Sequence, residues 1–317
     1  MDIQERQRRR EDSRRGVRRR RRLAGGVSVL VLAAVLVIVA AGGSSGGSKT
    51  HPGGAFRPLS AGHGGGGSPT ASRAYGRPGH DPVPILMYHV IAHPPPAAPF
   101  PGLYVAPGEF AAQMQALKAA GWHAVTLDEL EAYWSRGVSL GPGKPIVLSF
   151  DNGYQSQYTQ ALPVLRKLAW VGDENLQLTG LPPSQGGLAE TQVQGLLAAG
   201  WELDTQGISH ADLITLDSRS LHSQVTVARK LLQQRYHVPV NWFCYPSGHY
   251  DAKVIAAVKA AGFSGSTTVV PGWAHPTEDR YRLHRLRVLG GTTAAQLLTL
   301  IAAIRDDPAA PPTYGGG

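Results

Sequence analysis

Residues 146–154 read Ile-Val-Leu-Ser-Phe-Asp-Asn-Gly-Tyr, and this stretch decides the fold of the 317-residue chain. The apolar run Ile146–Phe150 predicts a buried strand, and the polar pair Asp151 and Asn152 follows it directly. Similar apolar runs recur across residues 82–307, where they alternate with helical patterns. Repeated alternation of strand and helix predicts an α/β fold with a mainly parallel sheet, either open or closed into a barrel.

The predicted strands are short apolar runs, and the predicted helices carry apolar residues at helical spacing. Several helices end in Ala-Gly before a bulky residue, as at Gly121, Gly200 and Gly262, because glycine stops a helix. Strands are expected at Ile85–His89, Ile146–Phe150, Asn175–Leu178, Trp201–Asp204, Trp242–Tyr245, Gly265–Thr268 and Leu286–Leu289. Helices are expected at Pro107–Ala120, Leu127–Ser135, Tyr158–Leu168, Ala189–Ala199, Arg219–Tyr236, Ala252–Ala261 and Thr293–Arg305.

Polar clusters closely follow three of the predicted strands. In closed parallel barrels, functional residues collect at the carboxyl ends of the strands. The sequence therefore predicts a site at that end of the barrel. The clusters are Asp151 with Asn152, then Asp204 with Gln206 and His210, then Pro246 with Ser247 and Gly248.

The positive charge of the chain is concentrated at its beginning. Residues 1–22 hold eleven Arg against four acidic residues, a net charge of +7 out of +9 for the whole chain. The remaining residues are therefore close to neutral and show no basic face, which argues against a nucleic-acid partner. We expect residues 1–22 to form a basic cytoplasmic tail.

An uncharged apolar segment, residues 23–41, follows the arginine run. A helix of 19 residues spans roughly 28 Å, close to the thickness of a bilayer core, so we expect one transmembrane anchor. The positive-inside rule then predicts a single-pass protein of the cell membrane, with a cytoplasmic N-terminus and an extracytoplasmic main domain. The alternative is a cleaved signal peptide, because small residues at Val39–Ala41 offer a cleavage site.

The composition on either side of the globular part predicts disorder. Residues 42–81 are rich in Gly, Ser and Pro and are expected to form a flexible linker. Residues 308–317 are expected to form a disordered tail. The folded domain is therefore expected at residues 82–307.

Five stretches within the folded part resemble, in order, the motifs of the NodB-like polysaccharide deacetylase family, which contains carbohydrate esterases and de-N-acetylases. The order and spacing of the five stretches identify the chain as a divergent member of this family. The stretches are Pro84–His89, Ser149–Tyr154, Trp201–Leu213, Phe243–Asp251 and Arg280–Val288.

The resemblance implies a distorted (β/α) barrel and the hydrolysis of N-acetyl, or sometimes O-acetyl, groups on a polysaccharide. In the family, a divalent metal such as zinc, held by one Asp and two His, polarises the acetyl carbonyl and activates water. Carried over, Asp151 is the catalytic base and His210 is one metal ligand. The other two ligand positions are occupied by Asn152 and Gln206.

The altered ligand positions leave several alternatives open. Asn152 and Gln206 bring no charge, so zinc should bind weakly, and Asp204 is a candidate for the missing carboxylate. Glu174 and Gln177 could form a remodelled polar site, or could lie at a solvated strand end. The chain's one cysteine, Cys244, is expected to be a small core residue.

The remaining candidates have supporting roles. His284 is a candidate general acid, because some relatives place such a group in this region. Four residues are candidates for substrate binding, the aromatic ones because they can stack on sugar rings. These four are Tyr154, Tyr245, Pro246 and His89.

Two functions follow from the resemblance. The first is a membrane-anchored hydrolase that removes acetyl groups from a cell-envelope polysaccharide. The second is an inactive relative that binds a glycan or a partner at the cell surface. A third possibility is a different hydrolytic chemistry that uses Asp151, Asp204 and Glu174 as paired carboxylates.

Overall fold

The computed structural model describes residues 77–179, 181, 186–305 and 310–315. The predicted basic tail (1–22), the predicted anchor (23–41) and residues 42–76 of the predicted linker lie outside this part. Among the described residues, no helix has the length and apolar character needed to cross a bilayer. The membrane anchor therefore remains a prediction.

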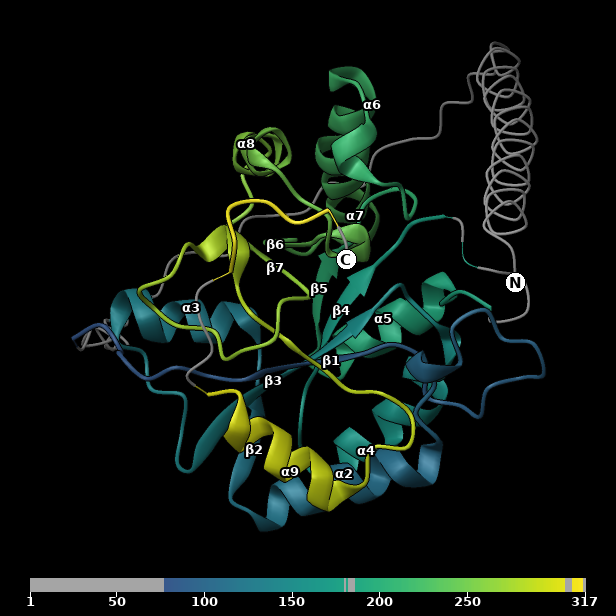
Figure 1. Cartoon of the computed structure of the whole chain (residues 1–317), viewed down its shortest axis with the longest axis vertical. Coiled ribbons are helices and arrows are strands. Elements are labelled where there is room, and N and C mark those ends of the chain that lie inside the picture. The colour runs from purple at the N-terminus through teal and green to yellow at the C-terminus, as the bar shows by residue number, and fades with distance from the viewer. Residues whose placement is uncertain (1–76, 180, 182–185, 306–309, 316–317) are drawn as a thin grey trace, which may run out of the picture. The chain divides into compact units, whose positions relative to one another are not determined.

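Parallel strands form the centre of the described domain (Figure 1). They lie in the order β7-β6-β5-β4-β3-β1-β8, and β2 pairs with the first half of β3. The expected parallel sheet is confirmed. The strands are β1 (Ile85–Tyr88), β2 (Trp122–Val125), β3 (Lys144–Asp151), β4 (Asp173–Leu176), β5 (Glu202–Thr205), β6 (Trp242–Cys244), β7 (Gly265–Thr267) and β8 (Leu286–Arg287).

The segment before β8 joins the two edges of the sheet. Leu283 forms a parallel bridge with Thr267, and the Arg285 amide donates to the Val270 carbonyl at 3.1 Å. The same segment continues into β8, which pairs with β1. The strands therefore close into a ring through a short and irregular connection, which is the distorted (β/α) barrel that the sequence predicts.

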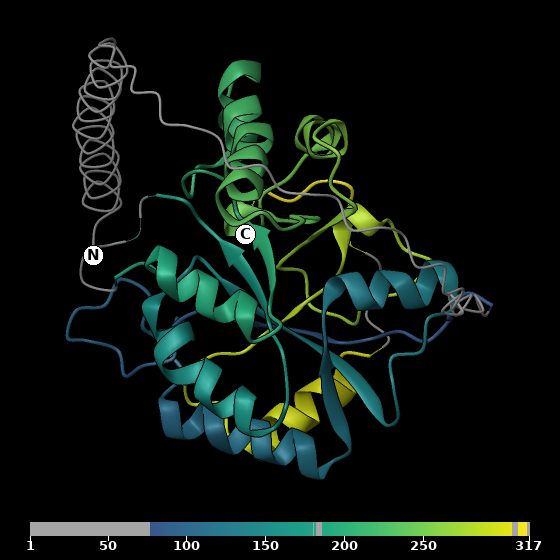
Figure 2. The same cartoon turned by 180° about the vertical axis from the view of Figure 1, so that it is seen from behind.

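Helices surround the strands, and α2 and α9 lie side by side in both views (Figures 1 and 2). The predicted helix Arg219–Tyr236 consists of α6, a π-helical turn over Ser223–Val227 and α7. The helices are α2 (Pro107–Ala119), α3 (Leu127–Arg136), α4 (Leu162–Lys167), α5 (Glu190–Ala198), α6 (Ser218–His222), α7 (Ala228–Tyr236), α8 (Ala252–Ala260) and α9 (Ala294–Ala303).

The pleat of β3 decides which of its residues reach the site, because successive side chains face opposite sides of a sheet. Leu148 and Phe150 pack among the outer helices, where the Phe150 ring centroid lies 4.8 Å from that of Trp201. Ser149 and Asp151 lie on the other face and contact groups inside the barrel. The alternation therefore puts Asp151 at the carboxyl end of the strand, inside the ring.

Two strands differ from those expected. Trp122–Val125 forms β2, which was not among the predicted strands, and β4 begins at Asp173 rather than Asn175. Asp173 and Glu174 are almost completely buried. The interpretation of Glu174 as a solvated strand end was therefore wrong. The sequence misled because adjacent acidic residues usually indicate a solvated loop.

The predicted disordered tail also differs, because residues 310–315 pack on the barrel. The backbones of Tyr250 and Tyr314 exchange two hydrogen bonds of 2.8 Å, and the Tyr250 hydroxyl donates to the Pro311 carbonyl. The two tyrosine rings stack at 6.4 Å between centroids. Aromatic stacking and β-type pairing therefore hold a segment whose composition indicates disorder.

We expect Tyr314→Ala to lower the free energy of unfolding by about 1–2 kcal/mol, because the stacked ring pair and its buried area are lost. Urea denaturation of the purified chain measures this change. Leu300→Ala on α9, where the leucine is 40% exposed, is the control and should change it by less than about 0.5 kcal/mol. Equal effects of the two variants would contradict a structural role for the tail.

Candidate active site

A cavity of about 640 Å³ opens at the carboxyl ends of the barrel strands. Its lining comes from residues at or just after the ends of β1, β3, β4, β5 and β6. This is the edge at which the sequence predicts a site. The lining includes His89, Asp151, Asn152, Tyr154, Gln177, Gln206, His210 and Tyr245.

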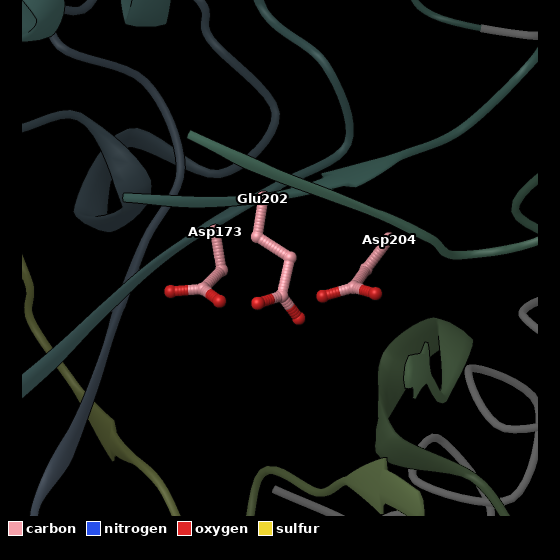
Figure 3. Close-up of side chains that lie close together, drawn as sticks. All are labelled: Asp173, Glu202 and Asp204. Atoms are coloured by element: carbon pink, nitrogen blue, oxygen red, sulfur yellow. The ribbon is translucent and has the colours of Figure 1, made fainter. Parts of the chain in front are cut away.

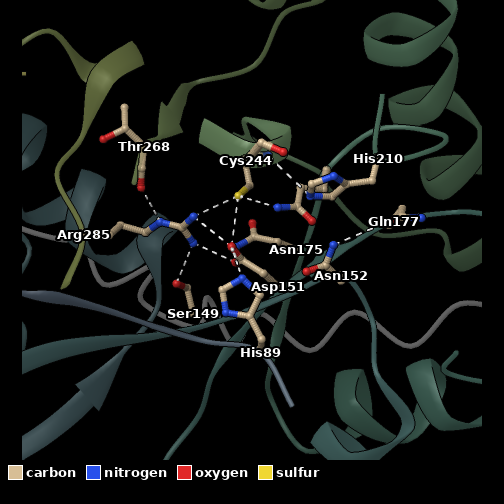
Figure 4. A network of polar contacts seen from close by, with 12 residues as sticks. His89, Ser149, Asp151, Asn152, Asn175, Gln177, His210, Cys244, Thr268 and Arg285 are labelled. Atoms are coloured by element: carbon tan, nitrogen blue, oxygen red, sulfur yellow. Dashed lines mark hydrogen bonds and ion pairs between the residues drawn. The ribbon is translucent and has the colours of Figure 1, made fainter. Parts of the chain in front are cut away.

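The floor of the cavity is built around an ion pair between Asp151 and Arg285, both almost completely buried (Figure 4). Arg285 Nη1 donates to Asp151 Oδ1 at 2.7 Å, and Nη2 donates to Oδ2 at 2.9 Å. Two parallel charge-assisted hydrogen bonds fix both the position and the plane of the carboxylate. Arg285 is fixed in turn by the Thr268 carbonyl at 2.7 Å and by Ser149 Oγ at 3.0 Å.

The ion pair also fixes the protonation state of Asp151. Burial alone would raise the pKa of this carboxyl group, but the nearby charge of Arg285 outweighs burial and lowers the pKa to about 2. Asn175 Nδ2 adds a hydrogen bond of 2.9 Å to Oδ1. Asp151 is therefore an anion at every pH above about 3.

Arg285 was not among the candidates from the sequence. It lies in the stretch Arg280–Val288, which supported the resemblance but suggested only His284 as a functional residue. Arg285 and Asp151 are 134 positions apart in the chain. The signal in the sequence was weak, because Arg280, Arg282 and Arg287 surround Arg285, and only burial, which calls for an anionic partner, sets Arg285 apart.

The backbone after Asp151 turns sharply toward the cavity. Asn152 has φ 78° and Gly153 has φ 81°, both in the left-handed region. Asn and Gly are among the residues that adopt this region most readily. A side chain at 153 would also collide with Leu176, because a Cβ built there lies 2.4 Å from a Leu176 methyl. Glycine at 153 is therefore required by the turn, and asparagine at 152 suits the turn.

His89 lies beside the ion pair. Its Nε2 is 3.9 Å from Asp151 Oδ2, and its Nδ1 is buried without a hydrogen-bond partner. Burial lowers the pKa of His89 to about 4, although Asp151 acts in the opposite direction. The imidazole is therefore neutral at pH 7.

His210 reaches the cavity from the loop after β5. The Ser247 amide donates to His210 Nε2 at 3.4 Å, and burial lowers the pKa of the imidazole. An amide can only donate, so Nε2 is the unprotonated nitrogen in this contact. His210 is therefore also neutral at pH 7 and presents an acceptor nitrogen.

Cys244 lies on β6 between the ion pair and Gln206. Its sulfur is 3.1 Å from Arg285 Nη2, 3.5 Å from Asp151 Oδ2 and 3.3 Å from Gln206 Nε2. Burial raises the pKa of the thiol to about 12. The thiol is thus protonated and completely buried, as expected for a core residue, although it packs against polar groups.

The three positions that the resemblance assigns to a metal do not fit a zinc ion. Asn152 Nδ2 donates to Gln177 Oε1 at 3.2 Å and Gln206 Nε2 donates to Cys244, so each amide offers at most a neutral oxygen. Gln206 Oε1 is buried without a partner. Asn152, Gln206 and His210 together therefore form a donor set without negative charge. The charge of the nearby Asp151 is already neutralised by Arg285. Zinc sites in proteins use imidazole, thiolate or carboxylate ligands.

Two candidates from the sequence do not reach the cavity. Asp204 Oδ1 accepts from the Trp242 amide at 2.8 Å, toward the amino end of the neighbouring strand β6. His284 is buried, with its Nδ1 2.7 Å from Glu278 Oε2. Neither residue lines the cavity, because each is held by a partner elsewhere.

The other candidates divide between the cavity and the outer layer. Tyr154 and Tyr245 line the cavity, and Ser247 and Gly248 line it in place of Pro246, which is buried in the same turn. Glu174 alternates with Asp173 and Asn175 on β4, so its side chain faces away from the barrel interior. The hypothesis of paired carboxylates at Asp151, Asp204 and Glu174 is not supported, because of the three only Asp151 lines the cavity.

Comparison with known proteins agrees with this architecture. A model of the family described as polysaccharide deacetylase matches residues 140–266. The protein YxkH of Bacillus subtilis, which bears the name of a polysaccharide deacetylase, is 26% identical over 223 residues, or 70% of this chain and 77% of that protein.

Solved structures agree as well. BC0361, a polysaccharide deacetylase from Bacillus cereus, is 25% identical with a TM-score of 0.62 and covers 70% of this chain and 69% of its own. The Streptococcus pyogenes deacetylase PplD in complex with acetate covers 70% of this chain and 99% of its own, with 23% identity and a TM-score of 0.65, and shows the shared fold.

The fold is thus a distorted (β/α) barrel like that of a solved polysaccharide deacetylase. Residues 140–266 match the polysaccharide deacetylase family, and within them Asn152 and Gln206 occupy two positions that the resemblance assigns to metal ligands.

We expect Arg285→Met to lower the free energy of unfolding by about 3–5 kcal/mol, because the Asp151 carboxylate stays buried without its partner. Urea denaturation at pH 7 measures the loss. Arg287→Met, two residues along and exposed, is the matched control and should change little. The double variant Asp151→Asn/Arg285→Met should lose less than Arg285→Met alone, and an equal loss would contradict this account of the ion pair.

The lowered pKa of His89 predicts a pH-dependent contribution to stability. Below its ordinary pKa of 6.5 the unfolded chain binds the proton more readily than the folded chain. The contribution of neutral His89 is therefore fully present above pH 6.5 and is lost as the pH falls through 4. Between these values the unmodified chain should lose up to about 3 kcal/mol more than His89→Gln in urea denaturation. Parallel pH profiles would rule out the lowered pKa.

Proposed function

We propose that the chain is a membrane-anchored, extracytoplasmic hydrolase that removes acetyl groups from a cell-envelope polysaccharide. The match of residues 140–266 to the polysaccharide deacetylase family supports the reaction class, and the similar proteins YxkH and BC0361 both carry that name. The arginine-rich residues 1–22 and the apolar residues 23–41 support the anchor and the location outside the membrane.

One observation carries the proposal: a carboxylate held ionised and immobile at the floor of a cavity. Asp151 Oδ1 accepts two hydrogen bonds, from Arg285 and Asn175, whereas Oδ2 accepts a strong bond from Arg285 and a weak one of 3.5 Å from the Cys244 thiol. Because a thiol is a weak donor, a water molecule in the cavity can replace it at Oδ2. This arrangement is suited to accepting a proton from the attacking water.

The reaction proposed for Asp151 balances without a further reagent. A water oxygen adds to the acetyl carbonyl carbon while one of its protons passes to Asp151 Oδ2. The same proton then moves to the sugar nitrogen or oxygen as the bond from that atom to the acetyl carbon breaks, and acetate leaves. A carboxylate with a pKa of about 2 is a weak base, so the protonated Asp151 is short-lived and gives its proton readily to the leaving nitrogen or oxygen.

The neutral imidazoles of the cavity assist in this proposal. An imidazolium formed at His89 would lie 3.9 Å from the Asp151 carboxylate, which would stabilise its charge. His210 presents an acceptor nitrogen to the same cavity. Either ring can therefore hold the water or the sugar amine by a hydrogen bond during the transfer.

The cavity lining supports a sugar substrate. Phe100 lines the cavity although 68% of it is exposed, and Tyr104, Tyr154 and Tyr314 line the same space. Aromatic rings provide flat apolar surfaces that suit the faces of pyranose rings, and Phe100 offers an exposed one, whereas Tyr104 and Tyr154 are largely buried. A polymer with an acetylated sugar therefore matches the shape and chemistry of the cavity better than a free small acid does.

We expect the purified full chain to release acetate from an acetylated envelope polysaccharide, and Asp151→Asn to reduce the rate by about 10²–10⁴-fold, because the isosteric amide cannot accept the proton. Acetate is measured by an enzyme-coupled assay, with and without chelator. Asp217→Asn, at an exposed helix cap, is the control and should keep the full rate. Glycan binding without acetate release by the unmodified chain would favour the non-catalytic alternative instead.

A further inference from the structure

A second group of carboxylates lies inside the barrel, away from the cavity (Figure 3). Asp173 and Glu202 are the first residues of β4 and β5 and are register partners, and Asp204 lies two residues after Glu202 on the same face. Each of the three offers one oxygen, and these oxygens all lie within 4.8 Å of one another. Within the described residues, this is the one such group of three or more His, Cys, Asp or Glu side chains.

Each carboxylate of this group is anchored by one oxygen to a backbone amide. Asp173 Oδ1 accepts from the Leu127 amide at 2.8 Å, Glu202 Oε2 from the Asp128 amide at 3.0 Å, and Asp204 Oδ1 from the Trp242 amide at 2.8 Å. These bonds come from the first turn of α3 and from the start of β6, so the three carboxylates are held in place from two sides.

The second oxygen of each carboxylate has no hydrogen-bond partner. Asp173 Oδ2, Glu202 Oε1 and Asp204 Oδ2 are all buried and unpartnered, and the side chains of Asp173 and Asp204 are completely buried. A buried acceptor without a donor is costly, and a buried anion is more so. Three such oxygens in one place point to a ligand that supplies positive charge.

The protein itself supplies little of that charge. Among the ion pairs of the described residues, none involves Asp173, Glu202 or Asp204. The neighbouring carboxylate, Asp128, adds negative charge and accepts from Asn241 Nδ2 at 2.7 Å and Trp242 Nε1 at 3.1 Å. The space between the three carboxylates is therefore strongly attractive to a cation.

We propose that Asp173, Glu202 and Asp204 bind a calcium ion as a structural site of the barrel. The donor set is made of carboxylate oxygen alone, which hard cations prefer over zinc or copper. Ligands on opposite sides of Ca²⁺, at about 2.3–2.6 Å each, lie up to about 5 Å apart, and the three oxygens, all within 4.8 Å of one another, satisfy this bound. Mg²⁺ usually keeps several waters and is bound by one or two carboxylates, so a buried group of three carboxylates suits Ca²⁺ better.

A surface recess lies beside this site. Glu202 and Asp128 are only partly buried, and Asp128 also lines a surface recess of about 460 Å³ with His123, Glu129 and Arg136. Water from this recess can complete the coordination shell. A bound calcium ion would thus connect β4 and β5 on the amino-terminal side of Asn175, the residue that donates to Asp151.

Terbium luminescence of the folded full chain tests the site directly. Tb³⁺ replaces Ca²⁺ in oxygen sites, and the Trp242 ring, whose nitrogen bonds Asp128, is placed to transfer excitation to it. We expect luminescence that Ca²⁺ displaces and that Trp242→Phe reduces at least fivefold. Trp273→Phe, whose indole bonds the Ile301 carbonyl instead, is the matched control and should leave it unchanged. Luminescence that Ca²⁺ does not displace would overturn the proposal.

Thermal unfolding of the chelator-treated full chain gives a second test. Saturating Ca²⁺ should raise the midpoint by about 5–10 °C, because it binds the folded state alone. The isosteric variant Asp173→Asn should lose this shift, whereas His210→Gln, in the cavity, should keep it. If Asp173→Asn does not fold, elemental analysis of the dialysed unmodified chain decides, with one calcium per chain expected. An unmodified chain without bound calcium and without a shift would mean that protons alone compensate the cluster.

Discussion

The buried ion pair between Asp151 and Arg285 is the interaction on which the rest of the site depends. It connects the end of β3 to the irregular segment that closes the ring, so the same two side chains complete the barrel and set the floor of the cavity. Buried ion pairs add little net stability but are costly to break. Here the pair specifies a geometry, because Ser149 and Thr268 can hold the guanidinium in one orientation only.

Buried polar groups line the barrel interior and are arranged by level. At the carboxyl end, Asp151 is compensated by Arg285, a partner from within the chain. Toward the amino end, Asp173 and Asp204 lack such a partner. Because the strands are parallel and their side chains alternate, each strand contributes to both levels. A substitution at one level therefore does not directly contact the other level, although both levels are built on the same strands.

The sequence predicted the fold well, because strand–helix alternation and the motif order depend on local patterns. It also predicted that Asp151, Gln206 and His210 meet at one cavity, since residues after parallel strands meet at one edge, but it wrongly added Asp204 and His284 to them. It did not predict Arg285, whose partner is distant in the chain, or the start of β4 at Asp173, where buried charges resemble a solvated loop. The packing of Tyr314 on the barrel was missed, because composition shows how strongly a segment tends toward disorder but not whether a folded surface is there to bind it.

Cys244 has a practical consequence for anyone who wishes to study the described domain by spectroscopy. Thiol reagents react with a thiolate that is accessible from solvent. The sulfur of Cys244 is fully buried, and its raised pKa keeps it protonated. No other cysteine occurs in the chain. A cysteine introduced on the rim of the cavity would therefore be the sole reactive thiol, and a spin label or fluorophore could be attached there without first removing the native residue.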